Sequence, residues 1–263
     1  MPGDVASPGF PGVAEHFPPT GRVGAMTQGF DLVEGVAAGL EDRAEAWWFV
    51  EDFARHWVAP LTDTDGWSEA DLVAAEQRLG LRLPAALREA YGLFGRRRDL
   101  TASHDVLLCP ADLHVDDLGV ALVFRHENQG AAAWGVLLTE LHRPDPAVVV
   151  RMDATGAPWQ GWLDRLSVAF VELVLSESLH APADRSDFLD ALDEKALRLV
   201  EEQYVQLPFP AYPTSAVTGG SRWFAGADVL LREDDGAVLL VRTRTVPALD
   251  ELRAAVPGDW LNA

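Results

Sequence analysis

Apolar residues recur at helical spacing in the segment from Gln28 to Leu61. Within EDRAEAWWFVEDFARHW, one helix face carries Trp47, Val50, Phe53, Ala54 and Trp57. A stripe of this kind is typical of a buried helix face, because large rings bury much apolar surface. A partner-binding surface would have the same pattern, so both interpretations stand.

Two further helices are predicted between Ser68 and Gly95. Ser68 is a favourable N-cap for the first, and Gly80 is a typical residue at its end. The second helix begins at Pro84, where the missing N–H group costs no hydrogen bond. The two helices are therefore separated by a short break rather than joined.

After Gly95 the pattern changes to short apolar runs that are typical of strands. These runs are His104–Cys109, Gly119–His126, Ala131–Leu138 and Val148–Met152. Their short connections favour antiparallel pairing. A helix then follows, with Asp164 as its predicted cap and an end near Leu179.

Residues 181–263 form a C-terminal extension of this pattern. We interpret residues 181–203 as an acidic helix, residues 207–221 as a loop and Pro247–Val256 as a final helix. Asp235-Gly236 lies between two apolar runs and predicts a hairpin. The extension either adds this hairpin to the same sheet or forms a small lobe. We expect the first, because an isolated hairpin is only marginally stable.

Together these patterns predict an α+β fold, with a largely antiparallel or mixed sheet flanked by N-terminal and C-terminal helices. Residues 1–28 are rich in Pro and Gly and predict a disordered tail. Residues 29–263 are expected to form one domain. Met26 is an alternative start of the chain.

Two motifs resemble signatures of one protein family. The first combines Trp67, the Ser-Glu start at Ser68, Glu76, the pattern LG..LP..L and the aromatic Tyr91; the second is ENQGAAAWGV, from residue 127 to 136. Both resemble the SUKH superfamily, which includes the fungal cell-wall assembly regulators, over roughly residues 30 to 180. The resemblance implies an α+β interaction domain, which in bacteria is usually an immunity protein that binds and silences a toxin. Because the family shares Glu76, we expect a capping or internal hydrogen bond there.

The net charge of the chain argues against some classes of binding partner. The chain has 41 acidic and 21 basic side chains, a formal charge of −20. This excess argues against nucleic-acid binding and against docking on an anionic membrane. It would steer a basic protein toward the surface, although it also serves solubility. No apolar run is long enough to span a membrane and the N-terminus lacks a signal-peptide pattern, so a cytoplasmic protein is expected.

Two acidic clusters are candidates for the surface that faces a partner. One is Asp187, Asp190 and Asp193, on the helix expected over residues 181–203. The other is N-terminal and consists of Glu41, Asp42, Glu45, Glu51 and Asp52. The sequence does not choose between them.

Known catalytic and metal motifs are missing from the sequence. His126-Glu127 begins the zinc pattern H-E-x-x-H, but no second histidine follows at the required position. No nucleophile elbow, P-loop or dinucleotide fingerprint occurs. Cys109, the only cysteine, near His104 or His114 is a minor candidate for a nucleophile. We therefore expect no catalytic residue, no cofactor and no metal.

The best candidate site is the run Glu127, Asn128 and Gln129 together with Trp134. Three consecutive polar side chains between two apolar strands need partners. They form either an internal hydrogen-bond network or a polar rim beside an aromatic anchor, while Trp134 itself fits a core position best.

The predicted function is a non-enzymatic protein-binding domain. It would be an immunity protein that neutralises a bacterial toxin, for example a nuclease, by occluding it. The first alternative is a regulatory or scaffold protein in signalling or cell-envelope control. The second is an enzyme whose site has no recognised motif.

Overall fold

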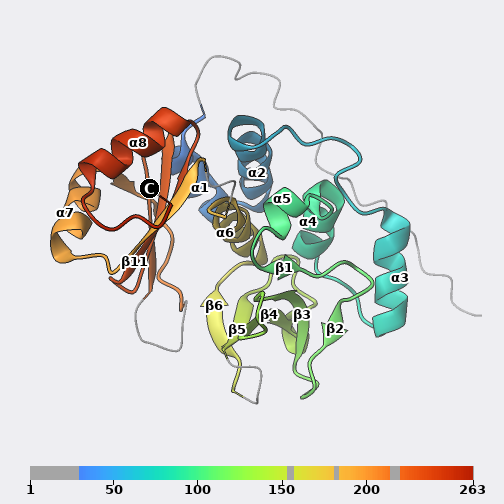
Figure 1. Ribbon diagram of the computed structural model, residues 1–263. Coiled ribbons are helices and arrows are strands. Elements are labelled where there is room, and N and C mark those ends of the chain that lie inside the picture. The colour runs from blue at the N-terminus through green and yellow to red at the C-terminus, as the bar shows by residue number, and fades with distance from the viewer. Residues whose placement is uncertain (1–29, 153–156, 181–183, 214–219, 263) are drawn as a thin grey trace, which may run out of the picture.

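The computed structural model describes residues 30–152, 157–180, 184–213 and 220–262. The tail predicted for residues 1–28 lies outside this described part. Over the described residues, eight α-helices and two antiparallel sheets form an α+β fold (Figure 1). This confirms the predicted fold class.

The helices and strands follow one another along the chain in two blocks. The helices are α1 (Leu32–Glu41), α2 (Arg43–Trp57), α3 (Glu69–Leu79), α4 (Ala85–Phe94), α5 (Arg98–Thr101), α6 (Leu166–Ser178), α7 (Glu194–Gln203) and α8 (Val246–Ala255). The first sheet contains β1 (Val106–Leu107), β2 (His114–Val115), β3 (Ala121–His126), β4 (Ala132–Leu137), β5 (Val148–Met152) and β6 (Gln160–Leu163). The second contains β7 (Ser186–Asp190), β8 (Val205–Gln206), β9 (Ser221–Ala225), β10 (Val229–Asp234) and β11 (Val238–Thr243).

Local sequence signals explain the N-terminal helices. The segment read as one helical stretch is two helices, because Asp42 caps α2 by accepting from the N–H groups of its first turn. Ser68 and Asp71 form a reciprocal capping box at α3, and Gly80 ends that helix at φ +67°. Glu76 accepts from the backbone N–H of Leu83 at 2.9 Å, which confirms the internal hydrogen bond expected for it.

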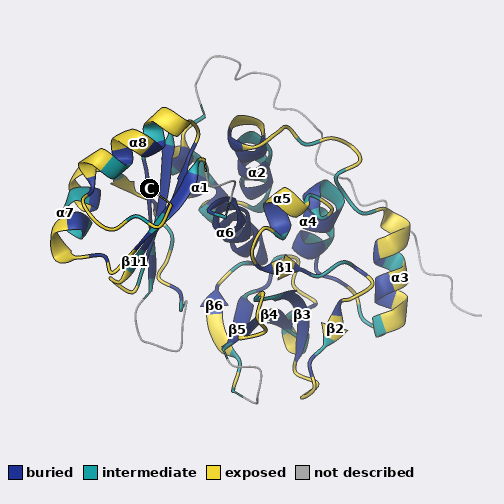
Figure 2. Ribbon diagram, viewed as in Figure 1, coloured by how far each residue is buried: buried dark blue, intermediate teal, exposed yellow. Residues whose placement is uncertain are grey.

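Helix α6 is the centre of the molecule. All of its residues are buried, and it lies between the second sheet on one side and α2, α4 and α5 on the other (Figures 1 and 2). Asp164 was expected to cap it, but the helix begins after Arg165 without a side-chain cap. Asp145 from a distant loop instead accepts from the Ser167 N–H at 2.8 Å. The first N–H groups of a helix have no partner within the helix, so at a buried helix start an acceptor from another segment has to satisfy them.

The C-terminal extension forms its own sheet, so the expectation of one shared sheet was wrong. Strand order is β7-β11-β10-β9-β8, and the hairpin turn at Asp235 and Gly236 has the positive φ angles of 57° and 71° expected for this pair. The hairpin is stabilised on both edges, by β7 and by β9. The acidic helix expected over residues 181–203 is only partly correct, because residues 186–190 form β7 and the helix begins at Glu194.

Two hydrophobic cores follow from this arrangement. The larger core lies between the first sheet, the helices around α6 and the inner face of the second sheet. It contains the predicted stripe on α2, which is therefore core rather than a partner surface. The smaller core lies under α7 and α8, on the outer face of the second sheet. The second sheet is thus covered on both faces.

Asp116 stabilises the turn between β2 and β3 through hydrogen bonds of its carboxylate. Its protonation should therefore make the stability of the fold depend on pH. Its Oδ1 accepts from the backbone N–H groups of Val120 and Ala121, and its Oδ2 accepts from Trp159 Nε1 at 3.0 Å. Burial alone would raise the pKa of this carboxyl, but these hydrogen bonds and nearby Arg151 hold it below its ordinary value of 3.8. A lowered pKa stabilises the fold above the unfolded-state pKa, and this contribution is lost as pH falls through the folded-state value.

We expect Asp116→Asn to cost about 1.5–3 kcal/mol at pH 7, because the new amide N–H₂ would face the donors of Trp159 and Arg151. Urea unfolding at pH 7 and pH 3 measures this. The deficit should narrow at pH 3, because that pH lies below the pKa of an aspartate in the unfolded chain and part of the wild-type carboxylate's contribution is then already lost. An equal deficit at both pH values would contradict the role of the ionised Asp116 carboxylate in stabilising the fold.

Candidate functional site

The predicted run Glu127, Asn128 and Gln129 forms the turn between β3 and β4. Glu127 Oε2 accepts from the backbone N–H groups of Gln129 and Ala131, at 2.8 and 2.9 Å. The Asn128 N–H donates to Asp105 Oδ1 at 3.3 Å. Gln129 is exposed. Glu127 and Asn128 therefore make hydrogen bonds within the fold, and Asn128 and Gln129 are both exposed at the tip of the turn.

Trp134 lies in the core beneath this turn. Its residue is 8% exposed, its ring packs edge-on against Trp162, and the guanidinium of Arg125 lies 4.5 Å from its ring centroid. Within the described part of the chain, its indole N–H has no hydrogen-bond partner. The structure thus places Trp134 next to the polar run but does not present it as a surface anchor.

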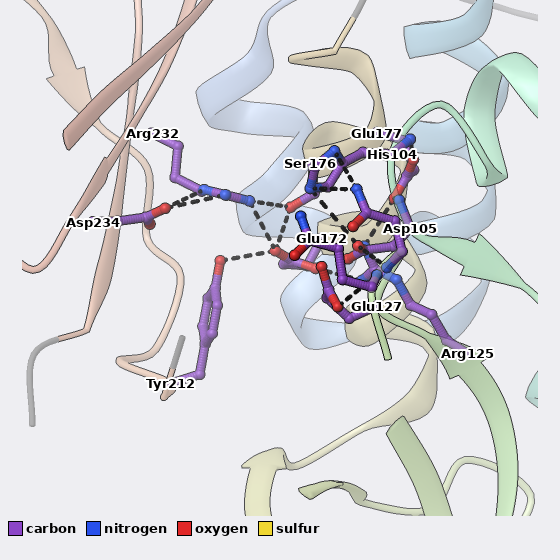
Figure 3. Close-up of polar contacts among 12 residues, drawn as sticks. His104, Asp105, Arg125, Glu127, Glu172, Ser176, Glu177, Tyr212, Arg232 and Asp234 are labelled. Carbon is purple, nitrogen blue, oxygen red and sulfur yellow. Dashed lines mark hydrogen bonds and ion pairs between the residues drawn. The ribbon is translucent and has the colours of Figure 1, made fainter. Parts of the chain in front are cut away.

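Arg125 organises a buried cluster of carboxylates (Figure 3). It is 3% exposed, and its Nη2 donates to Asp105 Oδ2 at 3.0 Å and to Glu177 Oε1 at 2.9 Å. Its Nη1 lies 3.5 Å from Glu172 Oε2. Glu177 also accepts from the His104 N–H at 2.7 Å, which fixes the loop before β1. One guanidinium therefore joins β3 to that loop and to α6.

Glu172 connects this cluster to the second sheet. Its Oε1 accepts from Ser176 Oγ at 2.5 Å and from the Tyr212 hydroxyl at 3.0 Å. Arg232 from β10 donates to Ser176 Oγ at 2.7 Å and pairs with Asp234 at 3.0 Å (Figure 3). The polar side chains of α6 therefore tie both sheets to the central helix through one continuous network.

Sequence reasoning missed most of this network. A charged residue inside an otherwise apolar strand, Arg125, was one available signal. The polar positions Glu172, Ser176 and Glu177 on a largely apolar helix were another. Buried charges are rare unless paired, so these positions indicate partners. The partners themselves come from distant segments and could not be read from the spacing.

A groove borders the network where the C-terminal end of α6 meets the second sheet. It has a volume of about 470 Å³ and is lined by His104, Leu179, His180 and residues of β7 and β11. The two imidazoles stack at 3.9 Å between ring centroids. Burial, together with His104 and nearby arginines, lowers the pKa of His180 to about 3, so this ring is neutral at physiological pH. The His180 ring therefore adds no positive charge to this groove.

Cys109 does not have the environment of an activated nucleophile. Burial raises the pKa of its thiol, and its Sγ donates to Asp112 at 3.0 Å. A neighbouring carboxylate further disfavours the thiolate, which is the reactive form. The charges around Cys109 therefore oppose the minor nucleophile hypothesis.

The basic side chains are largely neutralised within the fold. In the described part of the chain, fifteen arginines lie within 4.0 Å of a carboxylate. Pairing of this extent leaves little free positive charge for phosphate backbones. Among the helices of the described residues, none is long and apolar enough to cross a membrane.

The outer side of the second sheet carries a concentration of acids, which we call the α7–α8 face. Its exposed carboxylates belong to Asp193, Glu194, Glu201, Glu202, Asp250, Glu251 and Asp259. The exposed cations on the same segments are Lys195 and Arg198. Tyr204 at the end of α7 packs against the smaller core, to which Leu249 and Leu252 of α8 also belong.

One member of the expected acidic cluster is not on this surface. Asp187 was grouped with Asp190 and Asp193 as a candidate for contact with a partner. It lies instead in β7, is buried, and pairs with Arg253 at 2.5 Å. The grouping was wrong because the three residues do not share one helix face.

No protein-family model matches the chain, and neither a curated protein nor a solved structure is significantly similar to it. The resemblance to the SUKH superfamily therefore remains a prediction from the two sequence motifs.

Proposed function

We propose that the chain is a non-enzymatic protein-binding domain whose α7–α8 face binds a basic protein. The observation that carries this proposal is the surplus of exposed carboxylates on that face, with only Lys195 and Arg198 exposed among them. The SUKH resemblance suggests a bacterial toxin as the partner, silenced by occlusion. A nuclease fits well, because proteins that bind phosphate backbones are themselves basic.

Two physical features of the α7–α8 face support this role. Its helices pack on the smaller core through Val200 of α7 and Leu252 of α8, so they present a preformed surface. A preformed surface loses less conformational entropy on binding than a flexible one. Its negative field would also raise the rate of encounter with a cationic partner.

A pull-down from the native host followed by a binding assay tests the proposal. The bait is the full chain, compared with the double variant E202Q/E251Q, which removes two exposed carboxylates from the α7–α8 face. We expect a retained basic protein whose association rate at low salt falls severalfold in the variant. Its dissociation rate should change less, because close contacts rather than long-range charge hold a formed complex.

The matched control is E34Q/D63N, which makes the same change in net charge. Glu34 in α1 and Asp63 in the turn before α3 are both exposed. This control should associate at nearly the wild-type rate. If both double variants slow association equally, the effect comes from net charge alone and the proposed face is wrong.

A further inference from the structure

The turn between β3 and β4 meets the loop before β1 in an arrangement suited to a cation. One ligand atom from each of His104, Asp105 and Glu127 lies within 4.8 Å of the others. Ligand atoms around one zinc ion, at about 2.0–2.2 Å from the metal, are somewhat closer together. Because His104 is exposed and Glu127 partly exposed, small side-chain rotations would close this difference.

Backbone N–H groups and neighbouring side chains hold the three proposed ligand residues in place. Glu127 Oε2 accepts two backbone N–H groups of its own turn, so Oε1 remains for a ligand. Asp105 Oδ2 is held by Arg125, while Oδ1 accepts from the Asn128 N–H and lies 3.9 Å from His104 Nε2. The His104 ring also contacts the Asn128 side-chain amide, with Nδ1 3.0 Å from Nδ2. The backbone of His104 is itself held by Glu177. Partners of this kind orient the ligands of metal sites in proteins.

A second observation is the charge of the network to which these residues belong. Together with the proposed ligands Asp105 and Glu127 it contains five carboxylates, the others being Glu172, Glu177 and Asp234, against the two guanidinium groups of Arg125 and Arg232. Most of these groups are buried, and an uncompensated buried charge is costly. The excess is negative, and its solvent-accessible end is at His104.

We propose that His104, Asp105 and Glu127 bind a divalent transition-metal ion that balances this excess. A site with one imidazole and two carboxylates suits zinc, manganese or iron(II). A site made of oxygen ligands alone would suit these ions less well. The ion would join the β3–β4 turn to the loop before β1 and to the groove beside His180. Of the sequence pair His126-Glu127, only Glu127 belongs to this group, and the other two ligands come from the loop before β1.

Isothermal titration of ZnCl₂ into the chelator-treated, tag-free full chain tests the site. We expect binding of one ion per chain. His104→Ala and Glu127→Gln should each weaken the affinity by at least about tenfold, since loss of a supporting group alone costs roughly 10–100-fold. His142→Ala is the matched control, because His142 is also exposed and its Nδ1 lies 2.9 Å from the Thr139 carbonyl oxygen, away from the proposed ligands. It should bind zinc as the wild type does.

A second measurement separates ligand loss from misfolding. Thermal melts in the presence of a chelator should be similar for the wild type and His104→Ala, since His104 is exposed. Cobalt(II) absorption should show the d–d bands of a bound ion in the wild type and lose them in both ligand variants. The proposal is overturned if the wild type binds no zinc. The excess negative charge of the carboxylates would then have to be neutralised by protonation instead. The proposal is also overturned if both ligand variants bind zinc like the wild type, which would place the ion elsewhere.

Discussion

Replacement of Arg125 by Met is expected to lower the free energy of unfolding by about 3–5 kcal/mol, the usual cost of removing one partner from a buried ion pair. Met fills much of the same volume but leaves Asp105, Glu172 and Glu177 without their shared cation. Glu177 is 1% exposed, so water cannot replace the lost partner. Chemical denaturation monitored by circular dichroism measures the change.

Arg143→Met is the control for loss of an ion pair at the surface. Arg143 pairs with Glu140 at 2.9 Å, and both side chains are accessible to solvent. Exposed pairs contribute about 0–1 kcal/mol, so this variant should stay close to the wild type.

The pH dependence of the Arg125→Met deficit identifies its cause. Burial raises the pKa of Glu177, and the charge of Arg125 opposes that shift in the wild type. Without the arginine, the carboxyl should take up a proton at a higher pH, and the deficit should shrink as the solution is acidified. A deficit that stays constant between pH 8 and pH 5 would indicate lost packing rather than uncompensated charge.

Replacement of Trp134 by Ala is expected to cost about 3–5 kcal/mol, as for other large aromatic residues removed from a core. The indole packs against Trp162 and under the guanidinium of Arg125, so its removal leaves a cavity beside a buried charge. Thermal and urea unfolding measure the loss. A melt near that of the wild type would contradict the core assignment and revive the interpretation of Trp134 as a surface anchor.

Trp134→Phe separates the ring from its polar atom. Because the indole N–H has no partner among the described residues, phenylalanine removes no hydrogen bond. The cost should stay below about 1.5 kcal/mol, in the range of conservative core changes. A double-mutant cycle with Arg125→Met should be non-additive, since the two side chains are in contact.

Local signals made the helical part of the fold predictable. The capping box at Ser68 and the glycine at position 80 act within a few residues, so the sequence alone predicts the bounds of α3 closely. The Asp235-Gly236 hairpin is local in the same way. The class of the fold followed from these elements and from the short apolar runs between them.

The second sheet could not be predicted because its strands depend on distant partners. Residues 186–190 mix acidic and apolar side chains in an order that is also compatible with a helix. They are a strand because they pair with β11, where Phe188 faces Leu240. The C-terminal extension was expected to contribute only the β10–β11 hairpin. Because β7 and β9 pair with the two strands of this hairpin, the extension forms a separate sheet.

The candidate site was predictable only in part, for the same reason. Glu127 and Asn128 were found because three polar residues interrupt two apolar runs. Arg125 and Glu177, by contrast, are 52 residues apart in the sequence, and no local pattern connects them. The sequence could indicate that a buried arginine needs a carboxylate but not which one.

The association rate of the recovered partner over a salt series tests the central claim most directly. Surface plasmon resonance between about 0.05 and 0.5 M salt covers a severalfold change in the Debye length. If the α7–α8 face attracts a basic protein, the wild-type rate should fall steeply with salt, and the rate of E202Q/E251Q should fall less steeply. A wild-type association rate that is indifferent to salt would contradict the account and reduce the acidic face to a solubility feature.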